Sequence, residues 1–207
     1  MHHTVAKYIN SLFKILSFIL FLNTATHSNA QQNVIIEDLS GRTDLPEGAI
    51  NSLAQDDAGF IWLGTWKGLY RYDGYEVINF STINPHFTAL KIDEILIDGN
   101  NLWAGSFVTG LFKIDLQTYH ITNYTVESDQ AHRLNDNNVI ALCRMPGGIL
   151  MVGTERGGFH KIDSLGNVVK SYRIETHPEL LLNRQVSNIV QVDDETILLG
   201  NNALTFI

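Results

Sequence analysis

The histidines and the single cysteine are the residues of this 207-residue sequence that could do acid–base, nucleophilic or metal chemistry. His86, His120, His132 and His177 are scattered along the chain without the spacing of metal ligands. The motifs His-Glu-x-x-His, Gly-x-Ser-x-Gly, Cys-x-x-Cys and Gly-x-x-x-x-Gly-Lys are absent from the sequence. We therefore expect no catalytic residue, no metal site and no cofactor, and a chain that is not itself an enzyme.

Cys143 and two acidic pairs have structural explanations. Cys143 lies in the apolar run "VIALCRM", where a buried thiol is favoured over an activated nucleophile. Asp56-Asp57 and Asp193-Asp194 lack the alternating carboxylates and closing Glu of a calcium loop. Since Asp is favoured in turns for its hydrogen bonds to the backbone, we interpret both pairs as turns.

A Gly-containing segment recurs through the chain, as "IWLGTWKGLYRYD", "LWAGSFVTGLFKID", "LMVGTERGGFHKID" and "LLGNNALTFI". Its anchoring glycines are Gly64, Gly105, Gly153 and Gly200, at intervals of roughly 40 to 50 residues, a period typical of repeat architectures. Four short strands per period indicate the blade of a β-propeller. The predicted fold is therefore all-β: a β-propeller of about four blades, each of four antiparallel strands, as an incomplete ring.

Turn residues and apolar runs delimit the expected strands. The inner strands are expected at 50–55, 92–98, 139–145 and 186–192. The second strands follow at 60–65, 101–106, 149–154 and 196–201, and the third at 68–73, 110–115, 158–163 and 202–207. The outer strands are expected at 75–80, 119–124 and 168–173, with a type I′ hairpin at Asp73-Gly74.

Equivalent positions of the repeat predict the packing. Trp62, Trp103 and Met151 occupy one position, where a large apolar side chain would fill the space between blades. His160 aligns with Phe112 and is therefore expected to be a packing histidine instead of a ligand or base. The glycines are expected where φ is positive or where strands approach too closely for a Cβ atom.

The first repeat closely resembles the two-component regulator propeller repeat. The residues that match that pattern are Asp56, Gly59, Phe60, Ile61, Trp62, Gly64, Thr65, Gly68, Leu69, Arg71, Tyr72, Asp73 and Gly74. The later repeats match more loosely. The resemblance implies the extracytoplasmic sensor region of a hybrid two-component histidine kinase, for which oligosaccharides from polysaccharide breakdown are the usual stimulus. Because no kinase sequence follows Ile207, the chain is expected to be the amino-terminal piece of a longer sensor or a truncated open reading frame.

Residues 1–30 have the layout of a secretory signal peptide. Lys7 and Lys14 accompany an apolar run over 15–22, and Ser28-Asn29-Ala30 provides the small-x-small cleavage pattern. The run is shorter than the ~20 residues that span a bilayer. We therefore expect a cleaved leader, a propeller over 31–207, periplasmic localisation and no membrane span in the mature chain. A formal net charge of -8 argues against nucleic acid or an anionic membrane as partner.

Ligand binding is expected on the face of a propeller from which two kinds of loop emerge: those that connect second to third strands, and those that connect an outer strand to the next inner strand. Exposed aromatic rings beside amide and charged groups suit sugars, because the apolar ring face stacks while hydroxyls form hydrogen bonds. The candidate rim residues are Trp66, Lys67, Phe107, Thr109, Glu155, Arg156, Asn201 and Asn202. The function expected is glycan sensing; the alternative is an envelope propeller that binds other proteins and no small molecule.

An incomplete ring should self-associate. The first and last blades would expose apolar faces and strand edges, for which further blades or a second subunit would be the natural partners. The alternative is a small ring sealed by "NVIIEDL" (residues 33–39) pairing with the fourth blade. Light scattering on the purified chain should show oligomers, and a monodisperse monomer at high concentration would contradict the open ring.

Overall fold

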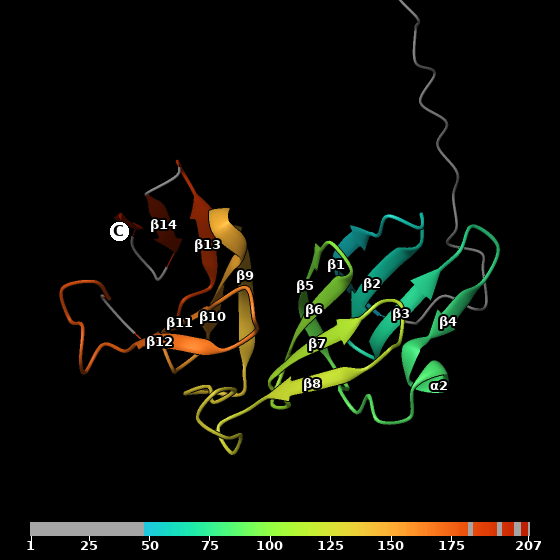
Figure 1. Ribbon diagram of the computed structural model, residues 1–207, viewed down its shortest axis with the longest axis horizontal. Helices are drawn as coiled ribbons and strands as arrows, with labels where there is room; N and C mark the ends of the chain where they lie inside the picture. The colour runs from blue at the N-terminus through green and yellow to red at the C-terminus, as the bar shows by residue number, and fades with distance from the viewer. Residues whose placement is uncertain (1–47, 182–183, 194–195, 201–203, 207) are drawn as a thin grey trace, which may run out of the picture. The chain divides into compact units, whose positions relative to one another are not determined.

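The computed structural model describes residues 48–181, 184–193, 196–200 and 204–206. These residues form three four-stranded sheets and one three-stranded sheet, and each sheet is an antiparallel meander of strands consecutive in sequence (Figure 1). The expected signal peptide, the segment "NVIIEDL", and Asn201 and Asn202 lie outside the described residues. The predicted all-β fold is confirmed.

The sheets, which we call blades 1 to 4, have the following strands. Blade 1 contains β1 (Ile50–Gln55), β2 (Ile61–Thr65), β3 (Gly68–Tyr72) and β4 (Val77–Asn79). Blade 2 contains β5 (Ile92–Asp98), β6 (Asn101–Ser106), β7 (Leu111–Asp115) and β8 (Ile121–Tyr124). Blade 3 contains β9 (Val139–Met145), β10 (Ile149–Thr154), β11 (Phe159–Ile162) and β12 (Val168–Tyr172). Blade 4 contains β13 (Asn188–Gln191), β14 (Ile197–Gly200) and β15 (Leu204–Phe206).

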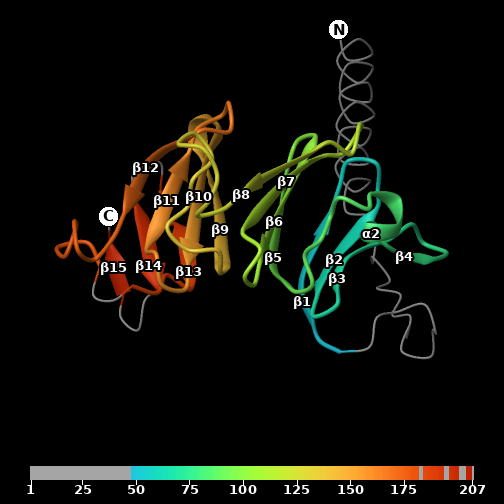
Figure 2. The ribbon, with the colours of Figure 1, turned by 90° about the horizontal axis from the view of Figure 1, so that it is seen from below.

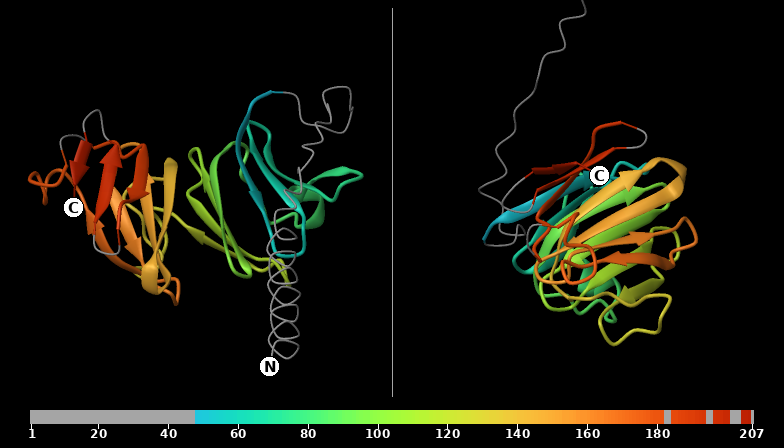
Figure 3. Two further views of the ribbon diagram at one scale, coloured as in Figure 1. Left: turned by 90° about the horizontal axis from the view of Figure 1, so that it is seen from above. Right: turned by 90° about the vertical axis from the view of Figure 1, so that its left-hand side faces the viewer.

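The first strand of each blade contacts the first strand of the next, from β1 to β5, β5 to β9 and β9 to β13. Blades 1 and 4 lie at opposite ends of this series, so the described part of the chain forms an open set of blades (Figures 2 and 3). Leu53 in β1 is 62% exposed and Val190 in β13 is 53% exposed. The two end blades therefore present apolar side chains to solvent, as expected for an open ring.

Three apolar clusters hold the four blades together, and each cluster combines residues of two neighbouring blades. Trp62, Trp103 and Met151 each belong to a different cluster, on the face of their blade that meets the next blade. All three are buried. The prediction that this repeat position fills the space between blades is confirmed.

The outer strand of blade 1 is shorter than predicted, and the hairpin before it differs in type. Phe80 to Ile83 form one helical turn, α2, capped by the Asn79 side chain, which accepts a hydrogen bond from the Ser81 N–H. Phe80 leaves the strand because its fully buried ring packs edge-on against Trp62, with centroids 5.5 Å apart. Gly74 has φ +96°, but Asp73 has no positive φ, whereas a type I′ turn centred on Asp73-Gly74 requires a positive φ at both residues.

Close approach between blades explains the anchoring glycines. A Cβ at Gly64 would lie 2.9 Å from Ile92 Cγ2, and one at Gly105 would lie 2.7 Å from Val139 Cγ1, in each case in the first strand of the next blade. A Cβ at Gly153 would overlap the Val186 carbonyl oxygen. None of the three has a positive φ, so space and not backbone conformation selects glycine there.

Two other repeat glycines are selected by conformation. Gly110 and Gly158 have φ of +89° and +78° at the start of the third strand. Their N–H groups donate to the carbonyl oxygens of Asn137 and Arg184, in the loops that lead into the next blade. A side chain would strain this left-handed turn.

His160 is fully buried in β11, at the position that Phe112 occupies in blade 2. Its Nε2 accepts a hydrogen bond from the Asn135 N–H at 3.3 Å, so Nδ1 carries the proton and donates to Ser171 Oγ at 2.8 Å. Burial, aided by the nearby charge of Arg173, lowers the pKa of His160 to about 3. The imidazole is therefore a neutral packing group, and its tautomer cannot accept the Ser171 proton.

We predict that Gly153→Ala destabilises the protein by about 1–3 kcal/mol, because the new methyl group must displace backbone of the next blade. Gly200→Ala is the matched control, since among the described residues the atom nearest to its Cβ would be Asn188 Cβ of the same sheet, at 3.1 Å. Urea unfolding of both variants measures the difference. Equal losses of stability would contradict the assignment of Gly153 to blade packing.

A second prediction concerns pH. Because the pKa of His160 in the folded protein lies below its ordinary value of about 6.5, its contribution to stability is complete above that pH and declines as the pH falls toward 3. The decline should approach ~1.4 kcal/mol per pH unit. His160→Phe should remove this slope between pH 6 and 4, whereas His120→Phe, an exposed control, should retain it. Denaturant unfolding across this range measures the slopes, and an unchanged slope in His160→Phe would contradict the prediction.

Candidate ligand-binding rim

A repeated backbone hydrogen bond places the candidate rim residues. In blades 1 to 3, the residue after the second strand donates its N–H to the carbonyl oxygen of the residue before the first strand of the same blade. The pairs are Trp66 with Ala49 at 3.4 Å, Phe107 with Lys91 at 3.1 Å and Glu155 with Asn138 at 2.9 Å. The three residues therefore occupy equivalent positions at the same end of their blades, on the face formed by these loops.

Lys91 lies against two of the predicted aromatic residues. Its Nζ is 4.9 Å from the centroid of the Trp66 ring and 5.1 Å from that of Phe107. Both distances permit a cation–π interaction. Trp66 is 60% exposed and Phe107 42% exposed. One ammonium group thus joins the exposed rings of blades 1 and 2.

Register shifts at the start of β1 and β5 supply the polar neighbours of these rings. The shifted residues are Asn51 and Asp93, and such bulges commonly redirect a side chain. Asn51 accepts a hydrogen bond from Trp66 Nε1 at 3.1 Å and donates to the Ile92 carbonyl oxygen at 2.7 Å. Asp93 Oδ1 is 2.7 Å from Lys91 Nζ. These contacts fix the orientation of the indole and of the ammonium group.

Glu155 and Asn138 extend the rim to blade 3. The Asn138 side chain donates to Glu155 Oε2 at 2.6 Å and accepts from the Val108 N–H at 2.8 Å, so it links the loops of blades 2 and 3. The hydrogen bond from Asn138, followed by that from Arg156, lowers the pKa of Glu155 below its ordinary value. Glu155 is therefore a carboxylate at neutral pH, available to accept hydrogen bonds.

The other predicted rim residues have local roles. Thr109 Oγ1 is 2.6 Å from Ser106 Oγ within the blade 2 loop. The Arg156 N–H donates to Asp136 at 2.7 Å, and the Lys67 N–H donates to Thr65 Oγ1 at 3.0 Å. The structure thus brings Trp66 and Phe107 together around Lys91, and Glu155 beside Arg156. We name the set Asn51, Trp66, Lys91, Asp93, Phe107, Asn138 and Glu155 the rim site.

The sequence-based prediction missed Asn51, Lys91, Asp93 and Asn138. All four lie at or just before the start of a first strand, in connections that the prediction placed on the binding face but from which it took no candidate residue. Alignment of the positions flanking the start of the first strands would have identified them, because those positions contact the predicted loops in blades 1 to 3. Among the described residues, no group of three or more His, Cys, Asp or Glu could hold a metal ion. No helix in that part of the chain is long and apolar enough to cross a membrane.

Comparison with known proteins identifies the repeat. Residues 44–67 match the sequence model of a family described as "Two component regulator propeller". No curated protein sequence matches the chain. The match covers the end of the lead-in, β1 and β2, and the beginning of the first rim loop.

Solved structures agree on the fold. The extracellular domain of the putative hybrid two-component system BT3049 from B. thetaiotaomicron matches with a TM-score of 0.70 and 23% identity, over 79% of this chain and 24% of that one. The corresponding domain of BT4673 from the same organism matches with a TM-score of 0.60 and 22% identity, over 74% and 19%. The WD40 β-propeller domain of Doa1 matches with a TM-score of 0.60 and 12% identity, over 78% and 51%.

The chain thus spans about a quarter or less of the two extracellular domains that it matches. At these identities the structural likeness establishes the fold, and the sequence model establishes the kind of repeat. The chain is a β-propeller that carries a two-component regulator propeller repeat.

Proposed function

We propose that this chain is the ligand-sensing propeller of a two-component sensor in the periplasm, and that the rim site binds oligosaccharides derived from glycans. The repeat at residues 44–67 and the likeness to extracellular domains of putative hybrid two-component systems support the sensor role. In this proposal residues 1–30 direct export, and a histidine kinase belongs to the complete sensor. The chain itself binds a ligand and performs no reaction.

The observation that carries the proposal is the pair of exposed rings, Trp66 and Phe107, held beside Lys91 at the loop ends of two adjacent blades. A pyranose ring has an apolar face that stacks on an aromatic side chain and a rim of hydroxyls that form hydrogen bonds. Glu155, at the equivalent position of blade 3, supplies a carboxylate acceptor on the same face. The rim site therefore combines stacking surfaces with hydrogen-bonding groups.

Preorganisation strengthens this interpretation. Lys91 contacts both rings and Asp93, and Asn51 holds the Trp66 indole, so ligand binding would immobilise few additional side chains. Because ordering flexible side chains opposes association, a site whose rings are already held binds more tightly than one on free loops. Functional loops on a rigid β scaffold commonly follow this arrangement.

We predict that Trp66→Ala and Phe107→Ala each weaken oligosaccharide binding about tenfold, corresponding to ~1.4 kcal/mol for a lost stacking surface. Isothermal titration calorimetry with a panel of neutral and acidic oligosaccharides measures the effect on the purified chain. Tyr75→Ala is the control, because Tyr75 is 86% exposed in the turn before β4, at the opposite end of blade 1.

Undiminished binding by both rim variants would contradict the rim as the glycan site. If no oligosaccharide of the panel binds, and the rim variants instead abolish association with another envelope protein, the protein-interaction alternative replaces glycan sensing.

A further inference from the structure

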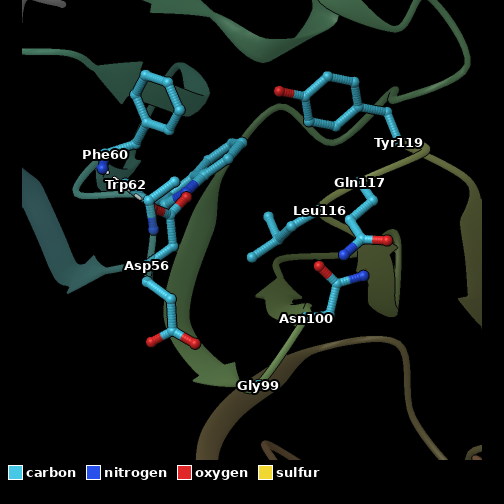
Figure 4. Close-up of a pocket in the computed structure, with 10 residues that line it drawn as sticks. Asp56, Phe60, Trp62, Gly99, Asn100, Leu116, Gln117 and Tyr119 are labelled. Carbon is cyan, nitrogen blue, oxygen red and sulfur yellow. Dashed lines mark hydrogen bonds between the residues drawn. The ribbon is translucent and has the colours of Figure 1, made fainter.

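A cleft of about 450 Å³ lies between blades 1 and 2, away from the rim site (Figure 4). It is lined by the β1–β2 turn of blade 1 and by the β5–β6 and β7–β8 turns of blade 2. In an antiparallel meander these turns lie at the opposite ends of the strands from the β2–β3 and β6–β7 loops of the rim. The cleft is therefore a second concave surface at the same blade junction, with a volume in the range of small-molecule sites.

One wall of the cleft is Tyr119, whose backbone is strained. Its φ is +56°, a conformation that bulky residues rarely adopt. Its N–H donates to the Asp115 carbonyl oxygen and its carbonyl oxygen accepts from Asn84 Nδ2, both at 2.8 Å. Its ring packs edge-on against Phe80, with centroids 5.6 Å apart. Strain that is maintained by several surrounding contacts is a frequent feature of binding sites.

Arg71 connects this wall to the opposite one. Its Nη1 donates to the Tyr119 hydroxyl at 2.6 Å, and its guanidinium lies 4.3 Å from the centroid of the Phe60 ring. Phe60 and Tyr119 lie on opposite sides of the cleft, with the Trp62 indole nearer Phe60 (Figure 4). The two rings are thus held apart by contacts that do not involve a ligand.

The polar lining consists of carboxylates and amides. Asp56 accepts hydrogen bonds from the Phe60 N–H at 3.0 Å and from Trp62 Nε1 at 2.8 Å, so it mainly organises the turn. Asp57 and Gln117 are exposed at the edge of the cleft. Asn100 donates through Nδ2 to Asp115, which leaves its side-chain oxygen as an acceptor. Hydrogen-bonding groups therefore surround the aromatic walls.

The charges select the class of ligand. An anion would meet Asp56 and Asp57. The Arg71 guanidinium, which is not itself a lining residue, is already engaged by the Phe60 ring and the Tyr119 hydroxyl. A cation would approach a Phe60 ring beside which the Arg71 guanidinium already lies. A purely apolar molecule would leave the carboxylates and amides without partners, which is unfavourable. A neutral molecule with an apolar face and several hydroxyls avoids both charge repulsions and provides hydrogen-bond partners for the carboxylates and amides.

We propose that this cleft is a binding site, separate from the rim site, for a neutral polyhydroxylated ring such as an uncharged pyranose, which lies between Phe60 and Tyr119. The carboxylate of Asp57 and the amides of Asn100 and Gln117 accept or donate hydrogen bonds to its hydroxyls. Ligand binding in this cleft does not depend on whether the rim site binds glycans.

The three tryptophans allow the two sites to be observed separately. Trp62 lines the cleft, Trp66 belongs to the rim site and Trp103 is buried between blades 2 and 3. Each gives one indole N–H resonance in an NMR spectrum of the ¹⁵N-labelled chain. Glucose, glucuronate and glucosamine serve as probes, because they share the pyranose ring and differ in charge.

Titration with glucose should shift the Trp62 resonance with a dissociation constant of about 1–10 mM, as expected for a small ligand with few contacts. Glucuronate and glucosamine should bind at least about fivefold more weakly. A shift of the Trp66 resonance would report binding at the rim site alone. The absence of binding at one site therefore does not affect the test of the other. An unchanged Trp62 resonance, or equal affinity for all three probes, would overturn the proposal.

Variants at exposed positions test the same cleft. Gln117→Ala should weaken glucose binding about threefold to tenfold by removing a neutral hydrogen bond. Ala58→Phe should abolish the Trp62 shift by filling the cleft from the β1–β2 turn. Gln130→Ala, an exposed glutamine outside the cleft, is the matched control and should bind like the unaltered chain. A Trp62 shift that persists in Ala58→Phe would place the ligand elsewhere and contradict the proposal.

Discussion

The close approach of each blade to the next is the constraint on which the rest of the structure depends. Gly64, Gly105 and Gly153 leave no room for a side chain because the next blade occupies that space. Burial of Trp62, Trp103 and Met151 then supplies the apolar contact that stabilises each junction. Each blade consequently has a defined position relative to its neighbour, and loops from two blades can form one surface.

Both proposed sites use the junction of blades 1 and 2, at opposite ends of the strands, and the rim site extends from there to blade 3. Lys91 joins the rings of Trp66 and Phe107 at one end, and Arg71 joins Phe60 to Tyr119 at the other. In each case a cationic side chain fixes two aromatic groups from different blades. The rim site is shallow and exposed, whereas the other site is a cleft, so the two surfaces suit ligands of different extent.

The buried His160 and the Asp residues at the ends of the third strands act in packing and in turn formation. Neutral His160 replaces an aromatic residue and forms hydrogen bonds through both ring nitrogens. The Asp residues that end the third strands, Asp73, Asp115 and Asp163, accept backbone N–H groups of the following turn, which lowers the pKa of each carboxyl. These groups therefore stabilise local structure.

The sequence by itself determined the strands, because an antiparallel meander pairs segments that are close along the chain. The strands β5, β6, β9 and β10 have the predicted bounds, and the repeated glycines and apolar residues occupy the predicted roles. Only the tertiary structure decided which side chains of different blades meet. The contacts of Lys91 with Trp66 and of Arg71 with Tyr119, the helical turn at Phe80 and the left-handed Tyr119 all arise from packing at a blade junction. Local propensity contains no information about such contacts, since their partners belong to separate repeats.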